Sequence, residues 1–136
     1  MHEAVFNFLK DKTTPKDWDS LKEIWKPVPF MYINDEPVYE FFETLDDSLD
    51  TSLQPIALSV NPIESFVPYH THNYVEIIIP IKGEVTILTE KERLLIKEND
   101  IFIVGPNTIH QNLPITKKDL ILNIALKQTA FSQSEL

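Results

Sequence analysis

The chain has 136 residues, of which 43% are hydrophobic, none is cysteine, 21 are acidic and 12 are basic, which gives a net charge of −9. This length supports one domain with its own core, and the lack of cysteine excludes disulfides and thiolate chemistry. The acidic balance argues against direct contact with phosphate backbones, and two glycines are too few for phosphate-binding loops. No segment resembles a membrane span or a signal peptide, so we expect a cytoplasmic protein.

A partly helical extension is predicted for residues 1–54. Apolar side chains on one side of residues 3–10 predict a short first helix. Thr14 can cap a second helix, Pro15 suits its first position, and Pro27 follows its end. The apolar residues that recur at helical spacing along this second helix are Trp18, Leu21 and Trp25.

The acidic segment 34–54 leaves its secondary structure open. Phe41, Leu45 and Leu49 are four apart, as on a helix, whereas the run PVYEFFE is typical of a strand. The seven acidic residues of this segment are compatible with a solvated connector and with an acidic recognition surface.

Residues 55–136 predict an all-β barrel. Short runs rich in Ile, Val, Leu and Phe recur at spacings of roughly 8 to 12 residues and are separated by turn-like groups. Gly83 lies between two runs, where a positive φ is often needed. Pro80 removes a ladder donor, so its strand should lie at a sheet edge or contain a bulge. The runs are IALSV, VEIII, EVTILT, RLLIK, DIFIVG and LILNIAL.

Three histidines and one glutamate form the candidate site. Side chains alternate along a strand, so His70 and His72 share a face, and Glu76 has the same parity. On a straight strand, however, Glu76 would lie roughly 20 Å from His70. Ligand atoms lie about 2 Å from a metal ion, so convergence requires a sharp bend, for which Asn73 is suited. His110 starts another extended run, which could face the first pair in a closed barrel.

Two stretches carry a resemblance to the cupin superfamily. HTHNYVEIIIPIKG, residues 70–83, resembles the first cupin motif with its internal spacing intact, and NDIFIVGPNTIH resembles the second motif. The chain departs from the usual residues at four positions. Glu64, Asn99 and Asn107 stand where the motifs usually have glycine, and Pro114 stands where the second motif usually has asparagine.

A narrower resemblance covers about residues 66–126. PYHTHNYVEIIIPIKGEVTI followed by IKENDIFIVGPNTIHQN resembles the N-terminal arm-and-barrel domain of AraC-type transcriptional regulators. This resemblance implies a cupin-like double-stranded β-helix (jelly-roll) barrel, a small-molecule effector for which a sugar is a candidate, and a homodimer formed through a helix outside the barrel. Such regulators continue into two helix-turn-helix units, which these residues lack. We therefore expect DNA contact only through a C-terminal domain absent from this chain.

The role of the candidate site stays open between three alternatives. It could hold a divalent metal such as Zn, Ni, Mn or Fe, line a metal-free ligand pocket, or only fix the barrel by hydrogen bonds. Tyr69, Tyr74 and Phe66 flank it and suit a sugar or another small organic ligand, with core or rim packing as the alternative. The three alternatives for the site, metal binding, ligand binding and structural hydrogen bonding, concern the residues His70, His72, Glu76 and His110.

Catalysis is not expected. The sequence has no recognisable Ser/His/Asp arrangement, and no second carboxylate lies near Glu76 for paired acid–base work. A stand-alone metal-binding cupin, of the oxygenase or isomerase type, is the alternative to a sensor domain.

Overall fold

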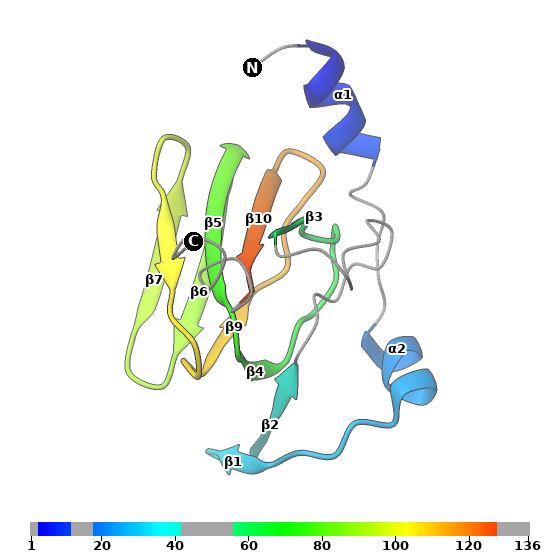
Figure 1. The fold of residues 1–136 in the computed structure, drawn as a ribbon, viewed down its shortest axis with the longest axis vertical. Coiled ribbons are helices and arrows are strands. Elements are labelled where there is room, and N and C mark those ends of the chain that lie inside the picture. The colour runs from blue at the N-terminus through cyan, green and yellow to red at the C-terminus, as the bar shows by residue number, and fades with distance from the viewer. Residues whose placement is uncertain (1–2, 12–17, 42–55, 128–136) are drawn as a thin grey trace, which may run out of the picture.

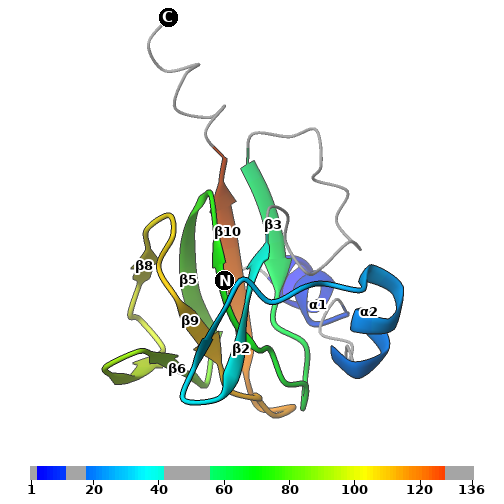
Figure 2. The same ribbon diagram turned by 90° about the horizontal axis from the view of Figure 1, so that it is seen from below.

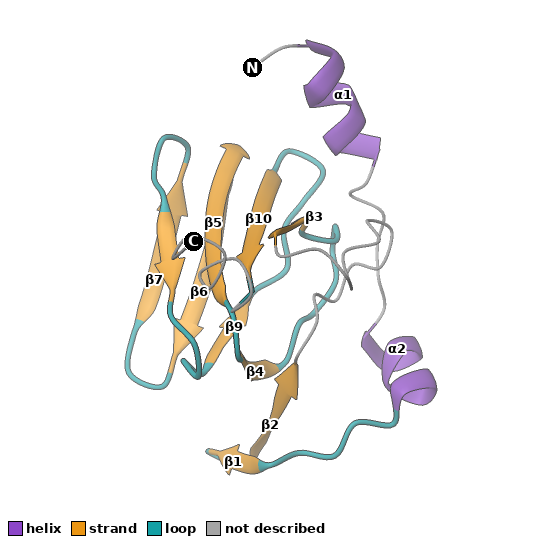
Figure 3. Cartoon of the chain, viewed as in Figure 1, coloured by secondary structure: helices purple, strands orange, loops and turns teal. Residues whose placement is uncertain are grey.

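A computed structural model of the chain describes residues 3–11, 18–41 and 56–127. In these residues two short helices precede ten strands, and the strands form two sheets (Figure 1; Figure 3). The elements are α1 (Glu3–Asp11), α2 (Trp18–Trp25), β1 (Met31–Ile33), β2 (Glu36–Phe41), β3 (Ile56–Val60), β4 (Tyr69–His72), β5 (Val75–Lys82), β6 (Glu84–Thr89), β7 (Arg93–Lys97), β8 (Phe102–Val104), β9 (His110–Asn112) and β10 (Leu120–Leu126).

The strand order is that of a double-stranded β-helix. One sheet runs β1-β2-β4-β9-β6-β7 and the other runs β3-β10-β5-β8. Strands β3, β4, β5 and β6 therefore alternate between the sheets, and each pairs with a partner from the second half of the chain in a nested antiparallel pattern. This is the arrangement of a jelly roll. It confirms the predicted all-β barrel, and among the described residues both helices lie in the N-terminal extension.

All six predicted runs are strands. Strands β5, β6, β7, β8 and β10 supply aliphatic side chains to the core between the sheets, whereas Val60 of β3 packs against Leu9 of α1. The predicted bulge at Pro80 is also confirmed. Against β10, Ile121 pairs with Pro80 but Leu120 pairs with Lys82, so Ile81 is the extra residue. Strand β8 pairs only with residues 76–78 of β5, and Pro80 lies beyond that ladder.

The backbone has a positive φ at the three positions where the chain lacks the glycines of the cupin motifs. Gly83 has a φ of 75°, as predicted for its turn. Asn99 and Asn107 have φ values of 73° and 64°, and Glu64 has a φ of 53°. Asparagine enters this left-handed region more readily than most residues, whereas glutamate does so at a cost of about 1–2 kcal/mol.

The core between the sheets is aliphatic. Ile78 and Ile121 come from the four-stranded sheet and are fully buried, and Ile87 from the six-stranded sheet is equally inaccessible. Helix α1 packs elsewhere, through Leu9, against Val60 and its neighbours, as Figure 2 shows beside β3 and β10. The inner and outer sides of the four-stranded sheet are therefore both apolar.

The N-terminal extension joins the six-stranded sheet. Trp18 at the start of α2 is buried and packs on Tyr39 of β2, with ring centroids 5.2 Å apart. Strand β2 confirms the strand alternative for residues 36–41 and pairs with β4 in parallel. The predicted Thr14 cap and the rest of the acidic segment lie outside the described residues. Neither helix of the described part is long and apolar enough to cross a membrane.

Candidate functional site

Two neighbouring strands bring the three histidines together. His70 and His72 share one face of β4, and His110 lies directly opposite His70 in the antiparallel pairing of β4 with β9. The ring centroids of His70 and His110 are 4.3 Å apart, and those of His72 and His110 are 5.1 Å apart. One ligand nitrogen from each ring lies within 4.8 Å of the others, and all three side chains are buried.

Each imidazole is fixed in one tautomer by its own local backbone. Nδ1 of His70 lies 2.9 Å from the carbonyl of Pro68, Nδ1 of His72 lies 2.7 Å from that of Tyr74, and Nδ1 of His110 lies 2.9 Å from that of Thr108. A carbonyl only accepts hydrogen bonds, so each Nδ1 must carry the proton and donate it. Each Nε2 is thereby left with a lone pair.

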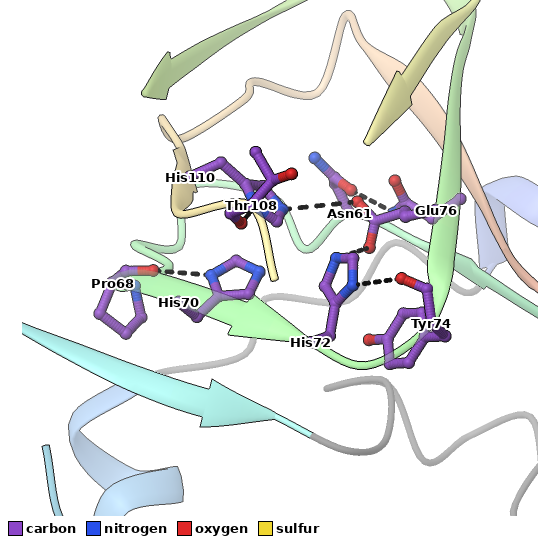
Figure 4. Close-up of polar contacts among 9 residues, drawn as sticks. Asn61, Pro68, His70, His72, Tyr74, Glu76, Thr108 and His110 are labelled. Atoms are coloured by element: carbon purple, nitrogen blue, oxygen red, sulfur yellow. Dashed lines mark hydrogen bonds and ion pairs between the residues drawn. The ribbon is translucent and has the colours of Figure 1, made fainter. Parts of the chain in front are cut away.

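Glu76 reaches the histidines from the opposite sheet. The chain turns at Asn73 and Tyr74 from β4 into β5, which confirms the predicted bend. Glu76 Oε2 then lies 3.5 Å from Nε2 of His72, and Oε1 lies 3.9 Å from Nε2 of His110. Figure 4 shows the carboxylate facing the rings. The site therefore spans the space between the two sheets.

Burial determines the charge of the site. It lowers the pKa of His72 to about 4, helped by the nearby His110, and it lowers the pKa of His70 and of His110 as well. Burial also raises the pKa of Glu76 to about 7. At neutral pH the rings are uncharged, so their contacts with Glu76 are not ion pairs.

When Glu76 is ionised, the site presents acceptors without donors. Nε2 of His72 and Nε2 of His110 are buried and have no hydrogen-bond partner among the described residues. They face a carboxylate, which is itself an acceptor. A cation placed among these atoms would satisfy all of them, and three imidazoles with one carboxylate are a common ligand set for divalent transition metals. An ion about 2 Å from each ligand would require movements of only about 1 Å.

The hydrogen bonds of the Nδ1 atoms also suit a metal. Histidines that bind metal usually donate the other ring N–H to a carbonyl or carboxylate, which fixes the ring and raises its basicity. All three histidines already do so here. The three buried histidines could therefore form a metal site.

The flanking aromatic residues take different positions. Tyr74 is buried, and its ring stacks on that of His72 with centroids 4.1 Å apart and an angle of 6°. Burial, and then the charge of Glu76, raise the pKa of the Tyr74 phenol. Strand alternation places Tyr69 on the face of β4 opposite His70. Burial, and then the charge of Glu36, raise the pKa of the Tyr69 phenol. Phe66 is 46% exposed.

Three asparagines of the barrel were missed in the sequence, and one of them, Asn61, lies next to this site. Nδ2 of Asn123 donates a hydrogen bond to Oδ1 of Asn61, and the two atoms are 2.5 Å apart. Figure 4 shows Asn61 beside Glu76. Oδ1 of Asn123 and Oδ1 of Asn112 are buried and have no partner among the described residues. A signal existed, because Asn123 interrupts the aliphatic run LILNIAL at an inward-facing position.

Comparison with known families and curated proteins gives one match. The family model described as the AraC-like ligand binding domain matches residues 54–128. This range contains every residue of the candidate site. No curated protein matches the chain.

Solved structures of cupins are similar to part of the chain. A cupin protein from Bacteroides fragilis is 26% identical, with a TM-score of 0.48, over 62% of this chain and 74% of its own. An RmlC-like cupin family protein with a double-stranded β-helix fold from Methanocaldococcus jannaschii is 25% identical, with a TM-score of 0.46, over 58% and 73%. A cupin-2 domain containing protein from Shewanella frigidimarina is 13% identical, with a TM-score of 0.48, over 62% and 82%.

Proposed function

The chain belongs to the AraC-like ligand binding domain family, and from this premise we propose that it senses a small-molecule effector at the histidine–glutamate site. In this proposal the effector binds between the two sheets and biases a DNA-binding domain of the same regulator. A ligand can do this only if it binds one arrangement of the protein more tightly than the other. The proposal matches the position of the site, which joins β4 and β9 of one sheet to β5 of the other.

The unsatisfied acceptors are the observation that carries the proposal. Two imidazole lone pairs without a partner are unfavourable in a buried site, because each loses its hydrogen bonds with water on folding. Such groups are retained where a ligand satisfies them. A partner with positive charge or hydrogen-bond donors fits this set, and an anion alone does not.

A divalent metal is the partner that we propose for the imidazoles. His70, His72 and His110 would supply three nitrogens, and Glu76 would supply the fourth ligand. When bound, such an ion acts as a Lewis acid with coordination positions open to an oxygen atom of the effector. Oδ1 of Asn123 and of Asn112 would then accept hydrogen bonds from effector hydroxyls, so a sugar or another polyol is the class of effector that we propose first.

Metal content and thermal shifts test this function. Protein purified without chelators should contain about one divalent ion per chain, and His72→Ala should weaken binding of added Zn²⁺ or Ni²⁺ by about 100-fold or more. His2→Ala, which removes the fourth histidine of the chain, is the matched control and should bind like wild type. Sugars and polyols should then raise the melting temperature of wild type but not of His72→Ala.

Two results would overturn parts of the proposal separately. Wild-type protein that neither contains nor binds a divalent ion would remove the metal while leaving an effector site possible. Effector shifts of equal size in wild type and in a His70→Ala/His110→Ala double variant would place the effector elsewhere.

A metal-dependent cupin enzyme is the second candidate. The observation that favours it is the pKa of Glu76, raised by burial to about 7, which suits a group that takes up and returns a proton near neutral pH. Turnover of a small molecule by metal-loaded wild type, abolished in Glu76→Gln with metal still bound, would favour this candidate over the sensor.

A further inference from the structure

Tyr74 contacts His72 through two different parts of the same residue. Its carbonyl accepts the hydrogen bond from Nδ1 of His72, and the two atoms are 2.7 Å apart. Its ring stacks on the imidazole, with centroids 4.1 Å apart and an angle of 6° (Figure 4). The other two histidines donate to carbonyls two positions before them, in Pro68 and Thr108, whereas His72 donates to a carbonyl two positions after it. The orientation of His72 therefore depends on the bend between β4 and β5.

The two contacts restrict different movements of the imidazole. A hydrogen bond fixes the direction of one N–H group but leaves the ring free to rotate about that direction. A parallel ring at van der Waals distance fixes the plane of the imidazole, because any tilt separates the two faces. Together the contacts set the direction of Nε2 of His72, which lies 3.5 Å from the carboxylate of Glu76.

The ring of Tyr74 is in turn held by the four-stranded sheet. Tyr74 is 4% exposed and packs against Ala125, which lies opposite Glu76 in the ladder of β10 with β5. The ring therefore contacts a histidine of one sheet and an alanine of the other. A ring that is buried and already stacked on an imidazole does not offer this face to a sugar. The packing thus favours another role for Tyr74 than the effector contact expected from the sequence.

We propose that Tyr74 is a positioning residue of the metal site, whose ring and carbonyl hold the imidazole of His72 in the orientation that binds the ion. This inference rests on the proposed function, because it requires a metal ion at His72. The phenol hydroxyl has no part in it, so phenylalanine should replace tyrosine. A leucine retains the carbonyl and an apolar side chain but loses the parallel contact between rings, so it should not.

Zinc titrations of chelator-treated protein, followed by isothermal titration calorimetry, test the proposal. Tyr74→Leu should weaken Zn²⁺ binding by about tenfold, which is at the upper end for one ring contact and at the lower end for groups that orient a metal ligand. Tyr74→Phe should bind Zn²⁺ within about twofold of wild type. Tyr69→Leu makes the same replacement on the opposite face of β4 and is the matched control, with wild-type affinity expected.

Histidine NMR separates positioning from a general loss of stability. Long-range ¹H–¹⁵N spectra of metal-free protein at neutral pH report which ring nitrogen of each histidine carries the proton. His72 should carry it at Nδ1 alone in wild type and in Tyr74→Phe, and should show both tautomers in Tyr74→Leu. His70 and His110 should keep the proton at Nδ1 in all three proteins, because their carbonyl partners belong to other residues.

Three outcomes would overturn this inference alone. They are a folded Tyr74→Leu that binds Zn²⁺ as tightly as wild type, a Tyr74→Phe as weak as Tyr74→Leu, and a single Nδ1–H tautomer of His72 in Tyr74→Leu. Each would be found with wild type that binds Zn²⁺, so the proposed function would stand. Wild type that binds no Zn²⁺ would instead remove the metal on which both proposals depend.

The melting temperature of each variant shows whether it is folded. Should Tyr74→Leu fail to fold, Tyr74→Met decides in the same way, because methionine fills the space with a flexible side chain that cannot fix the plane of the imidazole.

Discussion

Replacement of Glu76 by glutamine tests the electrostatics of the site without removing its shape. Burial raises the pKa of this carboxyl from its ordinary 4.5 to about 7. Because the folded pKa lies above the unfolded one, the carboxyl stabilises the fold below pH 4.5 and loses this contribution as the pH rises to about 7. The shift corresponds to about 3 kcal/mol. Glutamine cannot ionise, so metal-free Glu76→Gln should exceed wild type by about 3 kcal/mol at pH 8 and match it near pH 4.5.

Urea denaturation of chelator-treated protein, followed by tryptophan fluorescence between pH 5 and 8, measures this difference. The buried histidines have lowered pKa values and destabilise both proteins below about pH 6.5, so their effect cancels in the comparison. Glu90→Gln removes an exposed carboxylate and is the matched control. With Zn²⁺ added, the advantage of Glu76→Gln should shrink or reverse, because the ion favours the ionised carboxylate.

A difference that does not vary with pH would refute the reasoning. So would a metal-free Glu76→Gln that is less stable than wild type at pH 8. Either result would mean that a positive charge, such as a protonated histidine, already compensates the carboxylate in the metal-free fold.

Two further substitutions test the frame of the site by urea denaturation. Gly83→Ala should lower the free energy of unfolding by about 1–3 kcal/mol, because φ is 75° and the new Cβ would overlap the Asp119 carboxylate. Asn107→Gly, at another residue with positive φ, should change this free energy by less than about 1 kcal/mol. Ile121→Ala, at a fully buried position, should cost about 2–5 kcal/mol, while Ile101→Ala at a 65% exposed position should stay within about 0.5 kcal/mol. A Gly83→Ala or an Ile121→Ala as stable as wild type would contradict the corresponding packing.

The fold was largely readable from the sequence because its signals are local. Six strands of the barrel, β3, β5, β6, β7, β8 and β10, are short aliphatic runs between turn residues. The bend at Asn73 followed from the distance between His70 and Glu76. Pairing between distant segments carries no local signal. The parallel ladder of β2 with β4 joins residues about 30 positions apart, and the Asn123–Asn61 hydrogen bond joins residues 62 positions apart.

Of the site, the sequence predicted only which side chains share one face of a strand. Parity correctly grouped His70 with His72, and the same rule places Tyr69 on the other face of β4, although Tyr69 flanks the motif in sequence. Proximity in the chain was therefore a weaker guide than alternation. The tautomers were not readable at all, because they depend on carbonyl groups of Pro68, Tyr74 and Thr108 that only the folded backbone positions.

The position of the site links occupancy to the contact between the sheets. His72 and His110 belong to one sheet and Glu76 to the other, so the two buried nitrogens without a partner face the carboxyl across the space between the sheets. A cation bound there would attract both the nitrogens and the carboxylate and would draw β5 towards β4 and β9. Since β4 also pairs with β2, the N-terminal extension is hydrogen-bonded to the strand that carries two of the proposed ligands. In the proposed sensor, a change in occupancy would therefore reach residues outside the barrel through the pairing of β4 with β2.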